Sequence, residues 1–434
     1  MDRQFPDEEL ARLTAPLEAR AIAALEQDDD PALDDWLQRM ETGHLGLHML
    51  SIHTLARKAG MLRRDHGETK AREELLRIGA QLMATWVRQY RTGDYRGAIA
   101  DLVAVYVHQA GAVPQPLEET DDAVVLDLSP CGSGGRLEQD GFADKHPEWY
   151  GGWRDGVSSL CQACKACQGA LNSALGETVW STEKGSGGHC RMRFAKPSGQ
   201  TAPLFSDQER TALVTTRVQS ARARLAAGGR DIRELLEGQR QEWRPWHDFA
   251  VAWLACFYGT ALESGGADYL DAMLAETFEP AFQVGFPRYA ALSDAELVHE
   301  VAQTWHYHCA DFSVREESDR FVFTLDPCGS GGRLFRGELW RGLLNYGDDL
   351  VPIMDEPHPV NFHRVGAPSY CTHCAAANRA QFAGHDAGAA PLFFMVDGHA
   401  QILPGQPCRQ FSYKKGVSGG GVAAELRKQI APNA

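Results

Sequence analysis

Eight of the eleven cysteines in the chain fall into two sets that follow the same order. In each set a single cysteine precedes a Cys-x-x-Cys pair, and another single cysteine follows that pair. The two sets are Cys131, Cys161, Cys164 and Cys190, then Cys328, Cys371, Cys374 and Cys408. Four thiolates suit tetrahedral zinc, and a Cys-x-x-Cys turn supplies two ligands from one loop. The spacing therefore predicts two zinc ions, one in each half, with these cysteines as ligands.

An iron–sulfur cluster is the alternative cofactor. Cys161, Cys164 and Cys167 follow one another at a spacing that is typical of cluster ligands. The second set has Ala377 where it would need the counterpart of Cys167, so the repeated pattern favours zinc. The last two cysteines, Cys256 and Cys309, lie in apolar sequence and are predicted to be buried.

The first cysteine of each set lies in the same eight-residue string, Pro-Cys-Gly-Ser-Gly-Gly-Arg-Leu, at residues 130–137 and 327–334. An identical string so rich in Gly, Pro and Cys indicates an internal repeat. Its glycines allow backbone N–H groups to form an anion-binding nest, and arginine adds a fork for a carboxylate or phosphate. Alternatively, glycine allows close approach to the metal, and arginine balances its negative thiolates. The predicted substrate-binding residues are Arg333, Ser330, Arg136 and Ser133.

Histidine and glutamate recur around the repeated strings. His108 and His308 precede paired glutamates, and His48 aligns with His247. A histidine beside a glutamate that faces the cysteine segment would act as a general base and its orienting partner. The alternative is a buried histidine held by hydrogen bonds. The predicted catalytic residues are His308, Glu316 and His247.

Apolar periodicity predicts the elements that position these residues. Helices are expected at residues 70–90, 94–106, 247–262 and 293–308, the last with Ser293 as N-cap and Glu296 completing a capping box. Short β-rich runs at 124–128 and 321–325 end at prolines and are expected to be strands. Residues 392–396 are a further expected strand, with a return strand beginning at 402–403.

These patterns predict an α+β fold built by tandem duplication, in which each half is a helical segment followed by a small β-rich Cys₄ metal module. Residues 1–35 are an acidic leader and residues 418–434 a flexible tail. The first repeat spans 36–200, with helices in 36–112 and a cysteine module in 118–197. The second spans 201–417, with helices in 206–312 and a cysteine module in 316–415. The halves are expected to pack as an internal pseudo-dimer, compatible with a monomer.

Composition limits the partners. The net charge of −15 disfavours nucleic acid, which requires a basic face. No signal peptide is visible at the N-terminus. The longest apolar stretch, residues 251–262, holds about twelve residues against the roughly 18 that a membrane span needs. We therefore expect a cytoplasmic protein with reduced thiols, which binds a small-molecule substrate or ligand and neither nucleic acid nor membrane.

The string Asp-Pro-Cys-Gly-Ser-Gly-Gly-Arg-Leu at 326–334, the Tyr-Cys-Thr-His-Cys at 370–374 and the Cys-Arg-x-x-x-Tyr-Lys at 408–414 resemble a bacterial group of largely uncharacterised Cys-motif proteins. The first half departs from this pattern, with Ser129 in place of Asp and Gln162-Ala163 in place of Thr-His. The layout and the residues 188–194 are also similar to the aminothiazoline-carboxylate hydrolase-like family. That resemblance implies C–N or C–S chemistry on a small molecule.

The predicted function is a zinc-dependent enzyme of small-molecule metabolism, of hydrolase or lyase type, acting on a polar or anionic substrate. One alternative is a non-catalytic, zinc-stabilised module that binds a ligand or a protein. A further alternative is an iron–sulfur redox protein.

Overall fold

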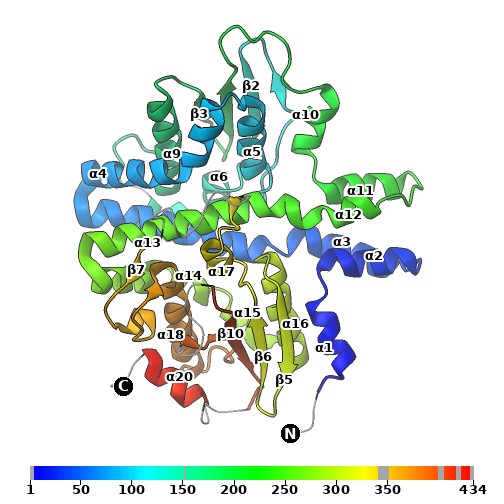
Figure 1. Cartoon of the computed structure of the whole chain (residues 1–434), viewed down its shortest axis with the longest axis vertical. Coiled ribbons are helices and arrows are strands. Elements are labelled where there is room, and N and C mark those ends of the chain that lie inside the picture. The colour runs from blue at the N-terminus through cyan, green and yellow to red at the C-terminus, as the bar shows by residue number, and fades with distance from the viewer. Residues whose placement is uncertain (1–3, 151–152, 341–350, 399–404, 417–421, 431–434) are drawn as a thin grey trace. The chain divides into compact units, whose positions relative to one another are not determined.

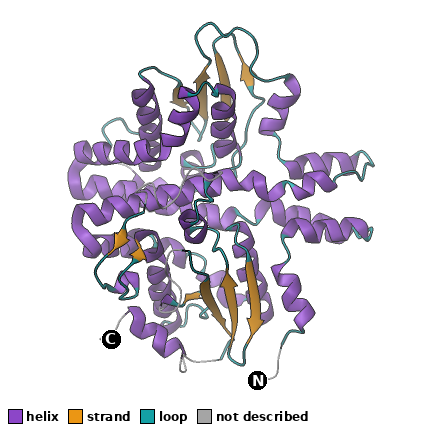
Figure 2. Ribbon diagram, viewed as in Figure 1, coloured by secondary structure: helices purple, strands orange, loops and turns teal. Residues whose placement is uncertain are grey.

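A computed structural model of the chain describes residues 4–150, 153–340, 351–398, 405–416 and 422–430 (Figure 1). Helices and antiparallel strands both contribute, so the predicted α+β class is confirmed (Figure 2). The chain forms two compact units. The continuous unit is Ala21–Trp253, and the split unit joins Met1–Arg20 to Leu254–Ala434. The units therefore change over at 20/21 and 253/254, whereas the predicted repeats meet at 200/201.

The continuous unit combines helices with one four-stranded sheet. Its elements are α2 (Leu17–Glu26, which begins before residue 21), α3 (Asp30–Thr42), α4 (Leu45–Arg91), α5 (Tyr95–Val107), β1 (Glu118–Glu119), β2 (Ala123–Leu128), α6 (Gly134–Gln139), α7 (Phe142–Lys145), α8 (Pro147–Tyr150), α9 (Ser159–Leu175), β3 (Trp180–Lys184), β4 (Cys190–Ala195), α10 (Asp207–Val214), α11 (Arg217–Ala226), α12 (Arg233–Glu237) and the start of α13 (Gln239–Thr277). The expected helices at 70–90 and 94–106 are confirmed, and the Asp94 side chain caps α5 by accepting from Gly97 N.

The sheet of the continuous unit has the strand order β1-β2-β4-β3, and all its neighbours are antiparallel. The expected strand at 124–128 is confirmed as β2, whose side chains are buried except at Asp127. In the β2–β4 register, Cys190 lies opposite Leu128, the last residue of β2. This register brings Cys190 to the end of the sheet where the chain enters the loop of residues 130–137, hereafter the Cys131 loop.

The split unit holds the second sheet and its helices. Its elements are α1 (Asp7–Thr14), the end of α13, α14 (Glu279–Gln283), α15 (Phe286–Ala291), α16 (Asp294–Tyr307), β5 (Phe312–Glu316), β6 (Arg320–Leu325), α17 (Gly331–Phe335), β7 (Ile353–Met354), η3 (Pro359–Asn361), β8 (Ala367–Pro368), η4 (Ser369–Cys371), α18 (Thr372–Asp386), β9 (Met395–Val396), β10 (Cys408–Tyr413) and α20 (Val422–Ile430). The expected helices at 247–262 and 293–308 are confirmed, as is the capping box between Ser293 and Glu296.

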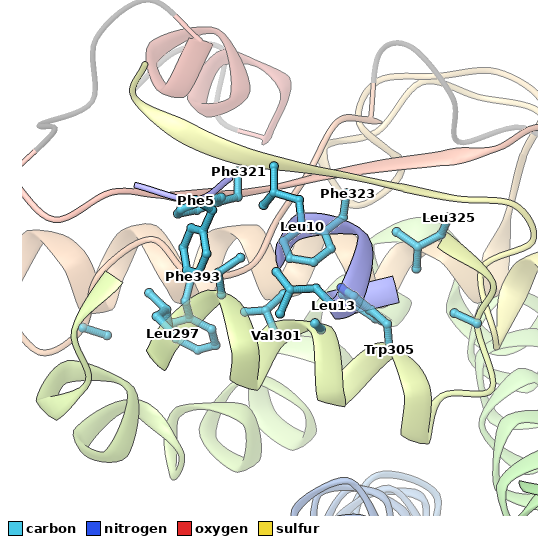
Figure 3. Close-up of a cluster of buried hydrophobic side chains, with 14 of the residues drawn as sticks. Phe5, Leu10, Leu13, Leu297, Val301, Trp305, Phe321, Phe323, Leu325 and Phe393 are labelled. Carbon is cyan, nitrogen blue, oxygen red and sulfur yellow. The ribbon is translucent and has the colours of Figure 1, made fainter. Parts of the chain in front are cut away.

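The second sheet has the order β5-β6-β10-β9, also fully antiparallel. The expected strand at 321–325 is confirmed as β6, and Cys408 lies opposite its last residue, Leu325. A buried core joins this sheet to α1 and α16, as Figure 3 shows. Phe5, Leu10 and Leu13 of the N-terminal segment are part of that core and are at most 4% exposed.

Both chain ends differ from the expected leader and tail. Residues expected as an acidic leader form α1, α2 and the start of α3, because their apolar side chains recur at helical spacing and are buried. The expected flexible tail contains α20, in which Ala423, Leu426 and Ile430 are buried. The return strand expected at 402–403 lies outside the described residues. Among the described helices, none is both long enough and apolar enough to cross a membrane.

Candidate functional site

The Cys131 loop holds its thiol with hydrogen bonds from the backbone and from a second cysteine. Gly135 N donates to Cys131 Sγ over 3.0 Å, and the backbone of Ser133 and the Cys190 thiol also hydrogen-bond this sulfur. The loop bends back on itself because Arg136 N donates to Cys131 O over 2.9 Å. Cys131 keeps 8% of its surface exposed, which restricts access to small molecules.

This arrangement favours a thiolate at Cys131. The hydrogen bond from Cys190 and those from the loop backbone outweigh burial and lower the pKa of Cys131 to about 7. The same bond raises the pKa of Cys190, because Cys190 keeps the shared proton. Burial raises the pKa of Cys161 to about 11 and that of Cys164 to about 12. Of these four thiols, Cys131 is therefore the one that ionises near neutral pH.

Two glycines allow the loop to approach the β3–β4 hairpin closely. Cys131 N donates to Gly188 O over 3.0 Å. A Cβ atom added to Gly135 would lie 2.2 Å from Gly188 O, and one added to Gly188 would lie 2.8 Å from Gly135 O. Gly188 also has a φ of 82°, which favours glycine. The two backbones therefore meet at a contact that leaves no room for a side chain, and this contact brings Cys190 to Cys131.

The flanking side chains fix the loop and place positive charge beside it. Ser133 Oγ donates to Gln109 Oε1 over 2.7 Å, and His48 Nε2 donates to Gly132 O over 2.6 Å. Burial lowers the pKa of His48 to about 3, so this ring is neutral. The Arg136 side chain keeps 32% of its surface and donates through Nε to Asp140. Of the predicted substrate-binding residues in this unit, Ser133 thus braces the loop and Arg136 remains partly accessible.

The corresponding loop of the split unit, residues 327–334 (the Cys328 loop), has the same backbone pattern and a different thiol state. Gly332 N donates to Cys328 Sγ over 2.9 Å, and Arg333 N donates to Cys328 O over 3.0 Å. Burial nevertheless raises the pKa of Cys328. Burial also raises the pKa values of Cys371 and Cys374, and raises that of Cys408 to about 12. This loop therefore holds a neutral thiol.

Arg333 and Ser330 serve the Cys328 loop itself. Arg333 is 2% exposed, and it donates to Gly329 O over 3.3 Å and to Glu338 O over 3.2 Å. Ser330 hydrogen-bonds the Cys328 thiol and the Tyr370 hydroxyl. Both residues were predicted to bind substrate, and the contacts described here tie them to neighbouring protein groups.

The predicted catalytic residues lie in different places. His308 is the C-cap of α16, and its carbonyl oxygen lies where a Cβ on Gly329 would be only 1.5 Å away, so it abuts the Cys328 loop through its backbone. Glu316, the last residue of β5, forms an ion pair with Lys414 and accepts hydrogen bonds from Gln4 N and Phe5 N. His247 belongs to the continuous unit, where its Nδ1 lies 3.1 Å from Asp248 Oδ1. Their catalytic roles stay a prediction.

The zinc prediction is wrong for both halves. Among residues that the structure describes, which include all eight proposed ligands, no group of three or more His, Cys, Asp or Glu side chains is arranged to hold a metal ion. The same finding removes the iron–sulfur alternative at Cys161, Cys164 and Cys167. The Cys-x-x-Cys pairs do not form the expected turns: Cys161 and Cys164 lie in α9, and Cys374 lies in α18. Individual thiols also have other partners, since Tyr106 Oη lies 3.1 Å from Cys164 Sγ.

Sequence reasoning missed a buried ion pair that occurs in both units. Lys196 Nζ lies 2.9 Å from Glu119 Oε1, and Lys414 Nζ lies 2.6 Å from Glu316 Oε1, with every one of these side chains at most 2% exposed. The available signal was the lysine six positions after the last cysteine of each set, together with the paired glutamates before each β-rich run. The roles of Gly188 and of the Cys190 thiol were also missed, because they depend on a contact between distant loops.

Comparison of the chain with protein-family models, with curated proteins and with solved structures finds no match. The resemblances to the Cys-motif group and to the aminothiazoline-carboxylate hydrolase-like family therefore stay predictions. The assignment of function has to come from the geometry of the two cysteine loops.

Proposed function

We propose that the chain is a thiol-dependent enzyme of hydrolytic type, which acts on a small polar or anionic molecule with Cys131 as its nucleophile. The observation that carries this proposal is the set of hydrogen bonds to the Cys131 sulfur, from Gly135 N at 3.0 Å, from Ser133 N and from the Cys190 thiol. Such donors stabilise a thiolate, which is the nucleophilic form of cysteine. The partly accessible Arg136 suits an anionic group on the substrate.

The chemistry needs no component beyond water and the substrate. The Cys131 thiolate adds to the electrophilic carbon of an ester or amide, and the leaving group departs with a proton taken from solvent. Water then hydrolyses the thioester that links the acyl group to the enzyme, which releases a carboxylic acid and restores the thiolate. The net reaction consumes one water molecule, as hydrolysis requires. A neutral thiol such as Cys328 is a poorer nucleophile for the first step.

We further propose that the two units arose by tandem duplication and that the chain functions as an internal pseudo-dimer in the cytoplasm. Support for duplication comes from the repeated eight-residue string, the shared strand order and the equivalent registers of Cys190 and Cys408. The buried Glu–Lys pair recurs as well. Support for a reducing compartment comes from the eight cysteines of the two sets, all of which are free thiols.

The test is hydrolysis of a panel of small carboxylate-bearing esters and amides, with product acid and intact enzyme mass measured together. We expect an acyl adduct on the peptide that contains Cys131, and at least a hundredfold loss of hydrolysis in Cys131→Ala. Cys328→Ala is the matched control and should retain activity within about twofold. Hydrolysis that survives Cys131→Ala would contradict the proposal and favour a non-catalytic role for this loop.

A further inference from the structure

The split unit binds residues 4–14 through hydrogen bonds and apolar contacts. The centre of this docking site is the buried pair of Glu316 and Lys414, at the ends of β5 and β10. Glu316 accepts a hydrogen bond from Gln4 N over 2.7 Å at Oε1 and one from Phe5 N over 2.9 Å at Oε2. One carboxylate therefore binds two consecutive backbone N–H groups of the N-terminal segment, residues 4–14.

The side chains of the N-terminal segment complete the contact. Phe5 is 4% exposed, with its ring edge-on to that of Phe321 at 5.6 Å. Leu10 and Leu13 pack into the same core as Leu297 and Val301, as Figure 3 shows. His306 Nε2 donates to Leu13 O over 2.9 Å at the end of α1. The docking site thus recognises a phenylalanine, two N–H groups and one face of a short helix.

The continuous unit has an equivalent site with an equivalent occupant. Glu119 accepts from Leu204 N over 2.5 Å and from Phe205 N over 3.2 Å, while it pairs with Lys196. Phe205 is 2% exposed and is followed by α10, just as Phe5 is followed by α1. In the continuous unit the occupant follows β4 closely along the chain and belongs to the same unit.

The two occupants differ in how they reach their sites. Residues 204–214 belong to the continuous unit, which binds them. Residues 4–14 belong to the split unit, but the chain passes from them into the continuous unit at residue 21 before it returns at residue 254. The split unit therefore binds a segment that is separated along the chain from the strands of that unit by the whole continuous unit. The same hydrogen bonds and apolar contacts would form if the segment came from another copy of the chain. Exchange of an identical segment between copies therefore costs little free energy.

We propose that the Glu316–Lys414 site is an exchangeable docking site whose partner is the N-terminal segment of a second copy of this chain. Within one chain, the chain's own residues 4–14 compete for the site at an effective concentration on the order of 1 mM. At a micromolar protein concentration the wild-type chain therefore keeps its own segment bound. Exchange becomes visible when one copy lacks a usable segment and another lacks a usable site. The inference is independent of the proposed thiol chemistry.

The test mixes two full-length variants. Phe5→Asp places a charge in the apolar core position and releases the segment, which leaves the site open. Glu316→Leu with Lys414→Met removes the acceptor and both charges while it keeps side-chain bulk, a replacement that folds tolerate well. Each variant alone is expected to be monomeric by light scattering. Their equimolar mixture should contain a dimer of twice the mass of one chain, because one intact segment meets one intact site.

The matched control replaces the double variant with Glu119→Leu and Lys196→Met, which changes the equivalent pair in the continuous unit. That chain keeps its own N-terminal segment docked, so its mixture with Phe5→Asp should remain monomeric. A mixture of the first two folded variants that also stays monomeric would overturn the proposal, and so would dimerisation of the control mixture to the same extent.

A peptide measurement decides the question if either variant aggregates. A fluorescein-labelled peptide of residues 1–16 is titrated with wild-type chain and, where it is soluble, with Phe5→Asp chain. We expect saturable binding that at least tenfold excess unlabelled peptide displaces, and no binding of the Phe5→Asp peptide. The chain's own residues 4–14 compete with the peptide at an effective concentration of about 1 mM. If the wild-type peptide does not bind at chain concentrations up to about 1 mM, the proposal is overturned.

Discussion

The Cys131 loop and the Cys328 loop have the same sequence over eight residues and differ in the state of their thiols. Both sulfurs accept a backbone N–H from the glycine four residues on. Only the Cys131 sulfur has a cysteine donor among the causes that shift its pKa, and only its pKa is lowered. The eight-residue string thus supplies the loop backbone, while a hydrogen bond from outside the string, from Cys190, sets the ionisation state of the thiol.

The buried Glu–Lys pairs provide the largest predicted difference between the units. Lys414→Ala would leave Glu316 buried without its cation, at a cost of about 3–5 kcal/mol in the free energy of unfolding. Lys196→Ala should cost less, because Arg210 Nη1 lies 3.6 Å from Glu119 Oε2 and remains as a cation. Urea denaturation of both variants measures the two costs. A larger loss in Lys196→Ala would show that Arg210 does not compensate.

Alanine in place of a loop glycine tests the contact that positions Cys190. In Gly135→Ala the new Cβ would meet Gly188 O at 2.2 Å, and we expect a loss of about 1–3 kcal/mol in the free energy of unfolding. The equivalent Gly332→Ala places its Cβ 3.1 Å from Pro327 Cβ and 3.4 Å from Cys328 Sγ, so its cost should be smaller. Equal costs, measured by thermal or urea unfolding, would mean that the two loops are equally crowded.

Removal of the cysteine donor should make the pKa of Cys131 more like that of Cys328. Cys190→Ala deletes the hydrogen bond that does most to lower the pKa of Cys131. The thiolate fraction of Cys131 and its alkylation rate at pH 7 should therefore both fall by about tenfold. Cys408→Ala is the matched change in the other unit and should leave the Cys328 rate nearly unchanged, since the main causes that shift the pKa of Cys328 are burial and hydrogen bonds from Gly332, Ser330 and Gly331. Peptide mass spectrometry after timed alkylation reports both rates. An unchanged Cys131 rate in Cys190→Ala would contradict the assigned donor.

The smallest expected effect is on acid stability. Burial alone would raise the pKa values of Glu316 and Glu119, but hydrogen bonds from lysine and from backbone N–H groups outweigh it and lower both. A carboxyl group whose pKa is lower in the folded state stabilises the fold above its unfolded pKa, and this stability is lost as the pH falls through the folded pKa. Glu316→Gln should therefore reduce the stability that the split unit loses as the pH falls. Glu119→Gln should do the same for the continuous unit. Unfolding curves between pH 7 and pH 3 check this.

Local features of the fold could be predicted from the sequence. The periodicity at 70–90 and 293–308 identified helices, and Ser293 and Glu296 identified a capping box, because these signals depend on neighbouring residues. The strands before each repeated string were likewise identified from β-rich runs that end at proline.

Long-range features could not be predicted. The Cys-x-x-Cys pairs suggested metal-binding turns, whereas Cys161 and Cys164 begin a helix whose register only tertiary packing determines. The docking of Phe5 against Phe321 joins residues more than 300 positions apart, and no local pattern encodes that contact. The recurrence of Lys196 and Lys414 was visible, but their role as buried partners of glutamate required the structure.

The most direct test of the difference between the two loops is the pH dependence of alkylation in the wild-type chain. Iodoacetamide labelling of Cys131 and Cys328 is followed by peptide mass spectrometry from pH 5 to pH 10. We expect the Cys131 rate to reach half its maximum near pH 7, as its pKa of about 7 requires, while Cys328 remains unreactive until well above that pH. Superimposable profiles, or a Cys328 that reacts at lower pH than Cys131, would contradict it.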